Sequence, residues 1–171
     1  IRDSHKRGTQ GIVNAVHAEE ILTGSLVNAR AVADYISGRQ PETVSLVAMG
    51  NGGERTARED VICARYIKCL LEGRTCLIDE EIRSLRTDGG EHFFRPQTQE
   101  IFPQEDFRLC TRRDIFPFVL RVEKRENGGR QALPGMGRNF VHLRFGKVFM
   151  FNSCDIMSGI HRQLCPHPIA G

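Results

Sequence analysis

Two adjacent acidic residues, Glu59 and Asp60, follow the glycine-rich stretch GNGGE and have the chemistry of metal ligands or a general base. At about 100° per residue, a helix through this segment places Asp60 within an apolar arc, whose other members are Ala57, Cys63, Ala64, Ile67 and Leu71. A buried carboxylate without partners is costly, so we expect Asp60 to meet a cation, a metal ion or a group of hydrogen-bond donors. The alternative is that Glu54, Glu59 and Asp60 only cap the helix and compensate its dipole.

The chemistry that such carboxylates allow is metal-assisted transfer of a phosphoryl group. Mg²⁺ takes one or two carboxylates, keeps bound water and completes its shell with substrate oxygens. Arg7 and Arg55 adjoin glycine turns, where they would either add charge-assisted contacts to a phosphate or remain solvated loop charges. Other polar side chains lie at or near the same turns, namely Thr9, Gln10, Ser25, Asn28 and Asn51.

The elements that must position these residues follow a repeated order of strand, glycine turn and helix. The apolar and polar pattern predicts a short helical segment from about Ile12, an extended segment at 19–24, a helix at 25–38 closed by Gly38, a strand at 43–49, and a helix at about 55–71 ended by Gly73. The strand at 43–49 has the length of a strand that is buried on both faces of the sheet. The first long helix should bury one face, made of Leu26, Ala29, Val32, Ala33 and Ile36.

This order is typical of parallel βαβ units, in which helix N-termini gather beyond the carboxyl ends of the strands. The turns RGTQG, TGSLVN and GNGGE would then converge, and their free N–H groups would attract a phosphate or a sulfonate. The alternative is that the glycines serve only as turn residues. Neither GNGGE nor GTQG matches the Walker lysine pattern or the dinucleotide fingerprint. We therefore predict an α/β fold, a layered α/β/α arrangement around a mostly parallel sheet.

Beyond about residue 80 the sequence becomes rich in loops. We predict a helix begun by Pro103 and a strand in FPFVLRVEKREN, which would form an edge of the sheet. Two aromatic-rich runs in NFVHLRFGKVFMFNS would form a hairpin around Gly146 and Lys147.

Composition limits the classes of function. The 171 residues suffice for one domain with a core, and a hydrophobic fraction of 40% with 26% charged residues is typical of a globular protein. A net charge of +3 is too small and too dispersed for a dedicated nucleic-acid binder. The sequence has no apolar run of about 20 residues, as a membrane span needs, and IRDSHKRGTQ lacks the apolar segment of a secretory signal. We expect a cytoplasmic protein with neither nucleic acid nor membrane as partner.

The six cysteines include no C-x-x-C pair, so we expect reduced thiols. The C-terminal Cys154, His161, Cys165 and His167 do not have the spacing of a common zinc finger, and an irregular terminal segment is the expectation there.

Four segments together resemble the 2-phosphosulfolactate phosphatase family. They are RGTQGIVNA, LTGSLVNARAVADYI, VSLVAMGNGGERTAREDVICARYI and FPQEDFRLCTRRDIFPFVLRVEKREN, which occur in the family's order across roughly residues 5–130. The combination of GSLVNARAVA with GNGGE and the acidic pair is more specific than any single glycine turn.

This resemblance implies an α/β fold and Mg²⁺-dependent hydrolysis of a small acidic phosphate ester, 2-phosphosulfolactate, to sulfolactate and phosphate on the route to coenzyme M. It implies substrate loops at Gly8, Thr9, Gln10 and Gly11 with Arg7, at Ser25 and Asn28, and at Asn51, Gly52, Gly53 and Glu54 with Arg55. Asp60 and Glu59 would lie nearest the metal. Asp60 is the first choice as ligand on helical phase, and Glu54 or Glu59 would position the attacking water.

Members of the family usually carry an N-terminal portion before the GTQG region, with an acidic and an arginine-containing motif. We therefore expect an incomplete sheet at 1–132 that would lean on a partner, which leaves a homo-oligomer open, and an extra segment of unassigned role at 133–171. The alternative to a phosphatase is a non-catalytic remnant, a binding or assembly domain that retains an anion pocket.

Overall fold

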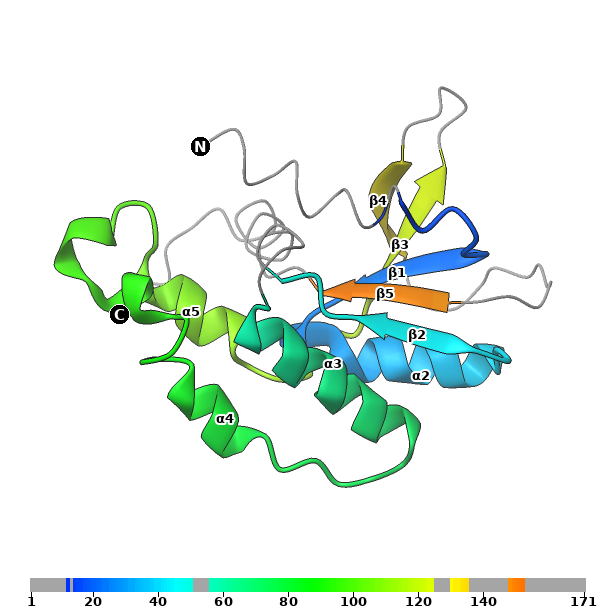
Figure 1. Ribbon diagram of the computed structural model, residues 1–171, viewed down its shortest axis with the longest axis horizontal. Helices are drawn as coiled ribbons and strands as arrows, with labels where there is room; N and C mark the ends of the chain where they lie inside the picture. Colours follow the sequence, from blue (N-terminus) through cyan, green and yellow to red (C-terminus); the bar gives the residue numbers. More distant parts are fainter. Residues whose placement is uncertain (1–11, 13, 51–55, 125–129, 136–147, 153–171) are drawn as a thin grey trace.

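The computed structural model describes residues 12, 14–50, 56–124, 130–135 and 148–152, which form one five-stranded sheet with helices packed against it (Figure 1). In chain order the elements are β1 (Glu20–Gly24), a 3₁₀ turn (Leu26–Asn28), α2 (Ala29–Arg39), β2 (Val44–Val47), α3 (Arg58–Leu71), α4 (Asp79–Ser84), two further 3₁₀ turns (Glu91–Phe94 and Pro96–Thr98), α5 (Gln104–Cys110), β3 (Val119–Lys124), β4 (Arg130–Gly135) and β5 (Val148–Asn152). Upstream of β1, Ile12 and Asn14 are helical, as predicted for that segment.

The strands lie in the order β2-β5-β1-β3-β4. The pairings of β5 with β2 and with β1 are parallel, whereas β1 with β3 and β3 with β4 are antiparallel. The fold is α/β, as predicted, but the sheet is mixed and not mostly parallel.

Two connections explain the antiparallel half of the sheet. Only residues 125–129 separate β3 from β4, too few for the crossover that a parallel pair needs. Before β3, the chain is tied to the turn that follows β1, because the Asp114 and Phe116 N–H groups donate to the Leu26 and Val27 carbonyls. Strand β3 therefore starts beside the carboxyl end of β1 and must run back along it.

The main core lies between one face of the sheet and helices α2 and α3, which lie side by side beneath it (Figure 1). The predicted apolar face of α2 is confirmed, since all five of its members are buried: Leu26, Ala29, Val32, Ala33 and Ile36. Leu22 of β1 joins this core, whereas the adjacent Ile21 packs on the other face against Ile12 and Ala18. This alternation is what a strand between two packed faces requires.

The ends of two helices were predicted from glycine residues, correctly for α3 and one position too early for α2. Gly73 stops α3 as predicted, with φ of 64° and the Arg74 N–H donating to the Cys69 carbonyl at 2.8 Å. The prediction that Gly38 closes α2 is wrong, because the helix runs to Arg39. Its last turn is closed by Gln40, which has a φ of 49° and donates its N–H to the Ile36 carbonyl at 3.1 Å.

Two of the predicted strands form with a different exposure or position from the one expected. Strand β2 forms as expected, but its residues are half-buried because it lies at one edge of the sheet. Strand β3 also forms, yet it is internal and not an edge, since β4 covers its outer side. Of the hairpin predicted around Gly146 and Lys147, the first run and the turn lie outside the described residues, and the second run forms β5, which pairs with β1 and β2. Helix α5 begins directly after Pro103, as predicted.

Candidate functional site

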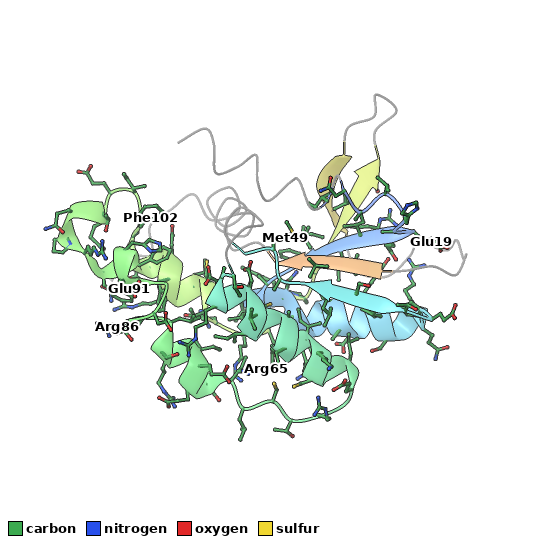
Figure 2. The ribbon with its side chains drawn as sticks, in the orientation of Figure 1. Glu19, Met49, Arg65, Arg86, Glu91 and Phe102 are labelled. Carbon is green, nitrogen blue, oxygen red and sulfur yellow. The ribbon has the colours of Figure 1, made fainter. Side chains whose placement is uncertain are left out.

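The carboxyl ends of β1 and β2 lie at the same end of the sheet, which is called the sheet edge below. Thr23 of β1 and Val47 of β2 align with the same residue of β5, Phe151, so the turns that follow them leave the sheet at the same level. In Figure 2, Met49 lies beside this edge and Glu19 lies at the opposite end of the sheet. Two of the three predicted turns therefore meet at one edge.

Two groups of predicted site residues lie outside the described parts of the chain. The turn RGTQG comprises Arg7, Gly8, Thr9, Gln10 and Gly11. The part of GNGGE after Gly50, with the residue that follows it, comprises Asn51, Gly52, Gly53, Glu54 and Arg55. Their roles stay predictions.

Asp60 is buried at this edge. The residue is 6% exposed, and its Oδ2 accepts a hydrogen bond of 2.8 Å from the Gly50 N–H. Gly50 has a φ of 65°, a conformation that glycine adopts at little cost, and this orients the turn after β2 towards α3. The prediction that Asp60 is buried is confirmed, and one of the donors that it meets is the N–H of the glycine turn.

The location of Asp60 in α3 also suits a negative charge. It lies in the first turn of the helix, where N–H groups lack helical partners and the helix dipole is positive. A cation brought to this edge would therefore meet the carboxylate of Asp60, and an anionic group would meet the N-terminal end of the helix.

Glu59 lies in the same turn of α3 but faces elsewhere. It is half-buried, and its Oε2 lies 3.7 Å from the point that a β-carbon on Gly89 would occupy. The two adjacent carboxylates thus approach different loops, Asp60 the turn at Gly50 and Glu59 the turn at Gly89. This favours Asp60 over Glu59 as the group closest to the sheet edge.

Two hydroxyl groups at the end of β1 are buried with no acceptor for their protons. Among the side chains that the structure describes, the Thr23 Oγ1 makes no hydrogen bond and the Ser25 Oγ makes none as a donor, with residue exposures of 2% and 5%. Ser25 is one of the predicted substrate-binding residues, whereas Thr23 was missed. In the sequence, Thr23 was indistinguishable from an ordinary β-branched strand residue.

Asn28, also predicted to bind substrate, is fully buried and has structural partners. Its Oδ1 accepts the Ser25 N–H at 2.9 Å, and its Nδ2 donates to the Phe118 carbonyl at 3.3 Å. The side chain therefore fixes the turn after β1 against the residue that precedes β3. Its role towards a substrate stays a prediction.

Asp114 forms a junction that the sequence analysis did not identify. Its Oδ1 accepts the Arg30 N–H at 2.8 Å and its Oδ2 accepts the Tyr66 hydroxyl at 2.6 Å. Its own N–H donates to the Leu26 carbonyl at 3.0 Å, with a φ of 55°. One carboxylate thus caps the first turn of α2 and ties it to α3. Burial and this carboxylate raise the pKa of Tyr66 to about 12.

Cys63 lies on α3 one turn after Asp60 and is fully buried. Burial, and then the negative charges of Asp60 and Asp114, raise the pKa of its thiol above the usual value. A thiol held in its neutral form is a poor nucleophile, so Cys63 is not suited to covalent catalysis. The four described cysteines are free thiols, as predicted: Cys63, Cys69, Cys76 and Cys110.

The described residues can supply one ligand for a magnesium ion but not a complete set. They contain no group of three His, Cys, Asp or Glu side chains that could hold a metal by themselves. Mg²⁺ does not need such a group, because one or two carboxylates are enough when water and substrate oxygens complete its shell. Asp60, buried beside a glycine turn, meets this requirement for one ligand.

None of the helices in the described part of the chain is both long enough and apolar enough to cross a bilayer.

Comparisons with known proteins give matches over much of the chain. The family model described as 2-phosphosulpholactate phosphatase matches residues 4–125. A "Probable 2-phosphosulfolactate phosphatase" of Bacillus subtilis (strain 168) is 24% identical over 120 residues, which are 68% of this chain and 51% of the relative. No solved structure matches the chain.

Two cyanobacterial proteins with the same printed name are also similar. The one from Synechocystis is 37% identical over 68 residues, covering 40% of this chain and 28% of the relative. The one from Nostoc punctiforme is 33% identical over 79 residues, covering 46% of this chain and 32% of the relative. The matched regions therefore span about half or less of the length of these relatives.

Proposed function

Because this chain belongs to the 2-phosphosulfolactate phosphatase family, we propose that it is a Mg²⁺-dependent phosphatase acting on a small acidic phosphate ester. The substrate suggested by the names of the relatives is 2-phosphosulfolactate, with sulfolactate and phosphate as products. Such a product would serve the route to coenzyme M.

The observation that carries this proposal is the buried carboxylate of Asp60 beside the turn at Gly50. A carboxylate in that location can bind a divalent cation, and the turn after β1 leaves the sheet at the same end, with β5 between β1 and β2. A phosphate ester at the sheet edge would then contact backbone N–H groups and hydroxyls on one side and the carboxylate-bound cation on the other.

The roles of the residues follow from their chemistry. Asp60, with Glu59 as the second candidate, would hold Mg²⁺, and Glu54 or Glu59 would orient the attacking water. Ser25 and the glycine turns would bind the phosphate, and Arg7 and Arg55 would add charge-assisted contacts. The bound ion supplies neutralisation of the charge that develops on the phosphoryl oxygens.

The test is release of inorganic phosphate from 2-phosphosulfolactate by the 171-residue protein, with Mg²⁺ and after chelation with EDTA. We expect turnover that depends on the ion and is restored when Mg²⁺ is added back. Absence of turnover, together with thermal stabilisation by sulfolactate or phosphate, would instead support a non-catalytic domain that retains an anion pocket.

A further inference from the structure

The hydroxyl of Thr23 is a polar group that the folded chain does not use. Within the described residues it is buried, it lacks a hydrogen-bond partner, and its residue is 2% exposed. Backbone pairing places Thr23 between Leu120 of β3 and Phe151 of β5, one residue before β1 ends. Its location is therefore fixed by the sheet on both sides.

Folding alone would favour a different residue at this position. A buried hydroxyl that gives up water without gaining a partner opposes folding, whereas valine has nearly the same shape and carries no polar atom. Neighbours on the same face of the sheet are apolar, as Ile21 and Leu120 are both buried. Unsatisfied buried polar groups are uncommon in native proteins, and a binding or catalytic role is one reason to keep them.

A second hydroxyl lies on the same side of the same segment. Ser25 follows Thr23 by two residues, and its Oγ is likewise buried, with no acceptor for its proton among the described residues. Residues two apart along an extended segment project to the same face, and Ser25 itself has extended backbone angles, with φ of −149° and ψ of 176°. The two unused donors therefore form a pair at the carboxyl end of β1, on the face that carries Ile21 and at the same end of the sheet as the contact of Asp60 with Gly50.

We propose that the Thr23 and Ser25 hydroxyls together donate hydrogen bonds to a tetrahedral oxyanion, a phosphate or a sulfonate, bound at the carboxyl end of β1. Thr23 is then a binding residue of the site. The inference rests on the proposed function, because it assigns to that site the donors for one anionic group of the substrate. Hydroxyl donors to an ionised oxygen form stronger hydrogen bonds than neutral pairs, which offsets the cost of keeping them buried.

The test uses Thr23→Val, which removes the hydroxyl and keeps the shape of the side chain. Inorganic phosphate and sulfolactate are titrated separately into the 171-residue protein by calorimetry, and thermal unfolding is measured without ligand. We expect Tm to rise by about 2–4 °C, because an unpaired buried group is removed. We expect the Kd for at least one of the two anions to rise by about tenfold, because a hydrogen bond to a charged group is lost. The anion that is affected identifies the group that Thr23 binds.

Two further variants give matched controls. Thr43→Val makes the same change at an exposed position before β2 and should alter neither Tm nor binding. Thr23→Ser keeps a hydroxyl and should retain most of the affinity.

Unchanged Kd values in Thr23→Val would overturn the inference, as would a lower Tm, since the hydroxyl would then have a partner within the fold. Failure of the wild type to bind either anion would overturn it too. Absence of phosphatase activity in a protein whose anion binding still depends on Thr23 would reject the proposed function and retain this inference.

Discussion

Asp60 and Asp114 both raise the pKa of the buried Cys63 thiol, yet the two carboxylates belong to regions built in different ways. At the Asp114 junction, both oxygens accept hydrogen bonds from regular elements, one from the first turn of α2 and one from Tyr66 of α3. At the sheet edge, Asp60 accepts from the N–H of Gly50, a residue of a turn. Unused hydroxyl protons of Thr23 and Ser25 lie at the end of β1, which β5 separates from β2.

The difference lies in what each carboxylate joins. Asp114 accepts donors from two helices and fixes their relative position, so its loss should loosen the molecule. Asp60 joins the first turn of α3 to the glycine turn after β2, the part of the chain that we propose binds the ligand. A substitution of Asp60 should therefore lower mainly the activity, and a substitution of Asp114 should lower mainly the stability.

The largest expected effect is on catalysis, from Asp60→Asn. The asparagine keeps an acceptor for the Gly50 N–H but loses the charge that would bind Mg²⁺. We expect phosphatase activity to fall by about 100-fold or more, while the free energy of unfolding changes by about 1 kcal/mol. Phosphate release and urea unfolding measure the two quantities.

The control for this variant is Asp34→Asn, which removes a carboxylate from an exposed position on α2 and should leave both quantities unchanged. Full activity in Asp60→Asn would remove Asp60 from the proposed metal site.

The next effect is on stability, from Asp114→Ala. Two donors, the Arg30 N–H and the Tyr66 hydroxyl, lose their acceptor, so we expect destabilisation by about 2–4 kcal/mol in urea unfolding. Asp114→Asn keeps one good acceptor and should lose about half as much. An Asp114→Ala protein of wild-type stability with no activity would reverse the roles that we assign to the two aspartates.

The smallest effect is the pH dependence due to Tyr66. Its pKa is raised to about 12 by burial and by Asp114, so the unfolded state, in which the usual value is near 10, ionises first. The stabilisation is complete below about pH 10 and is lost as the pH rises towards 12. We expect Tyr66→Phe to cost about 1 kcal/mol at neutral pH, and the gap between variant and wild type to narrow from pH 10 to 12. A constant gap across this range would show that Tyr66 does not titrate in this way.

Much of the local structure could be predicted from residue patterns. The apolar stripe from Leu26 to Ile36, the strand at β2, and the helix that ends at Gly73 all depend on neighbours within a few residues. The burial of Asp60 belongs to the same class, since helical phase placed it among apolar side chains. Its contact with Gly50 also needed only the short distance between a turn and the helix that follows it.

The features that were missed depend on partners far along the chain. Strand β5 has no sequence feature that places it between β1 and β2, and β3 runs antiparallel because residues 114–116 bind to the turn at 26–27. Asp114 is 84 residues from Arg30 and 48 from Tyr66, so no local pattern identifies it as a junction.

The sequence by itself determined the helices and strands between residues 19 and 73 and the apolar faces that they bury, because backbone propensity and hydrophobic periodicity act over short range. It predicted neither α4 nor β4. Only the tertiary structure decided strand order, the antiparallel half of the sheet, the difference between Asp60 and Asp114, and the unpaired state of Thr23. The physical reason is that hydrogen bonds are shared between segments: whether a buried donor or acceptor is satisfied depends on which distant residue the folded chain places beside it.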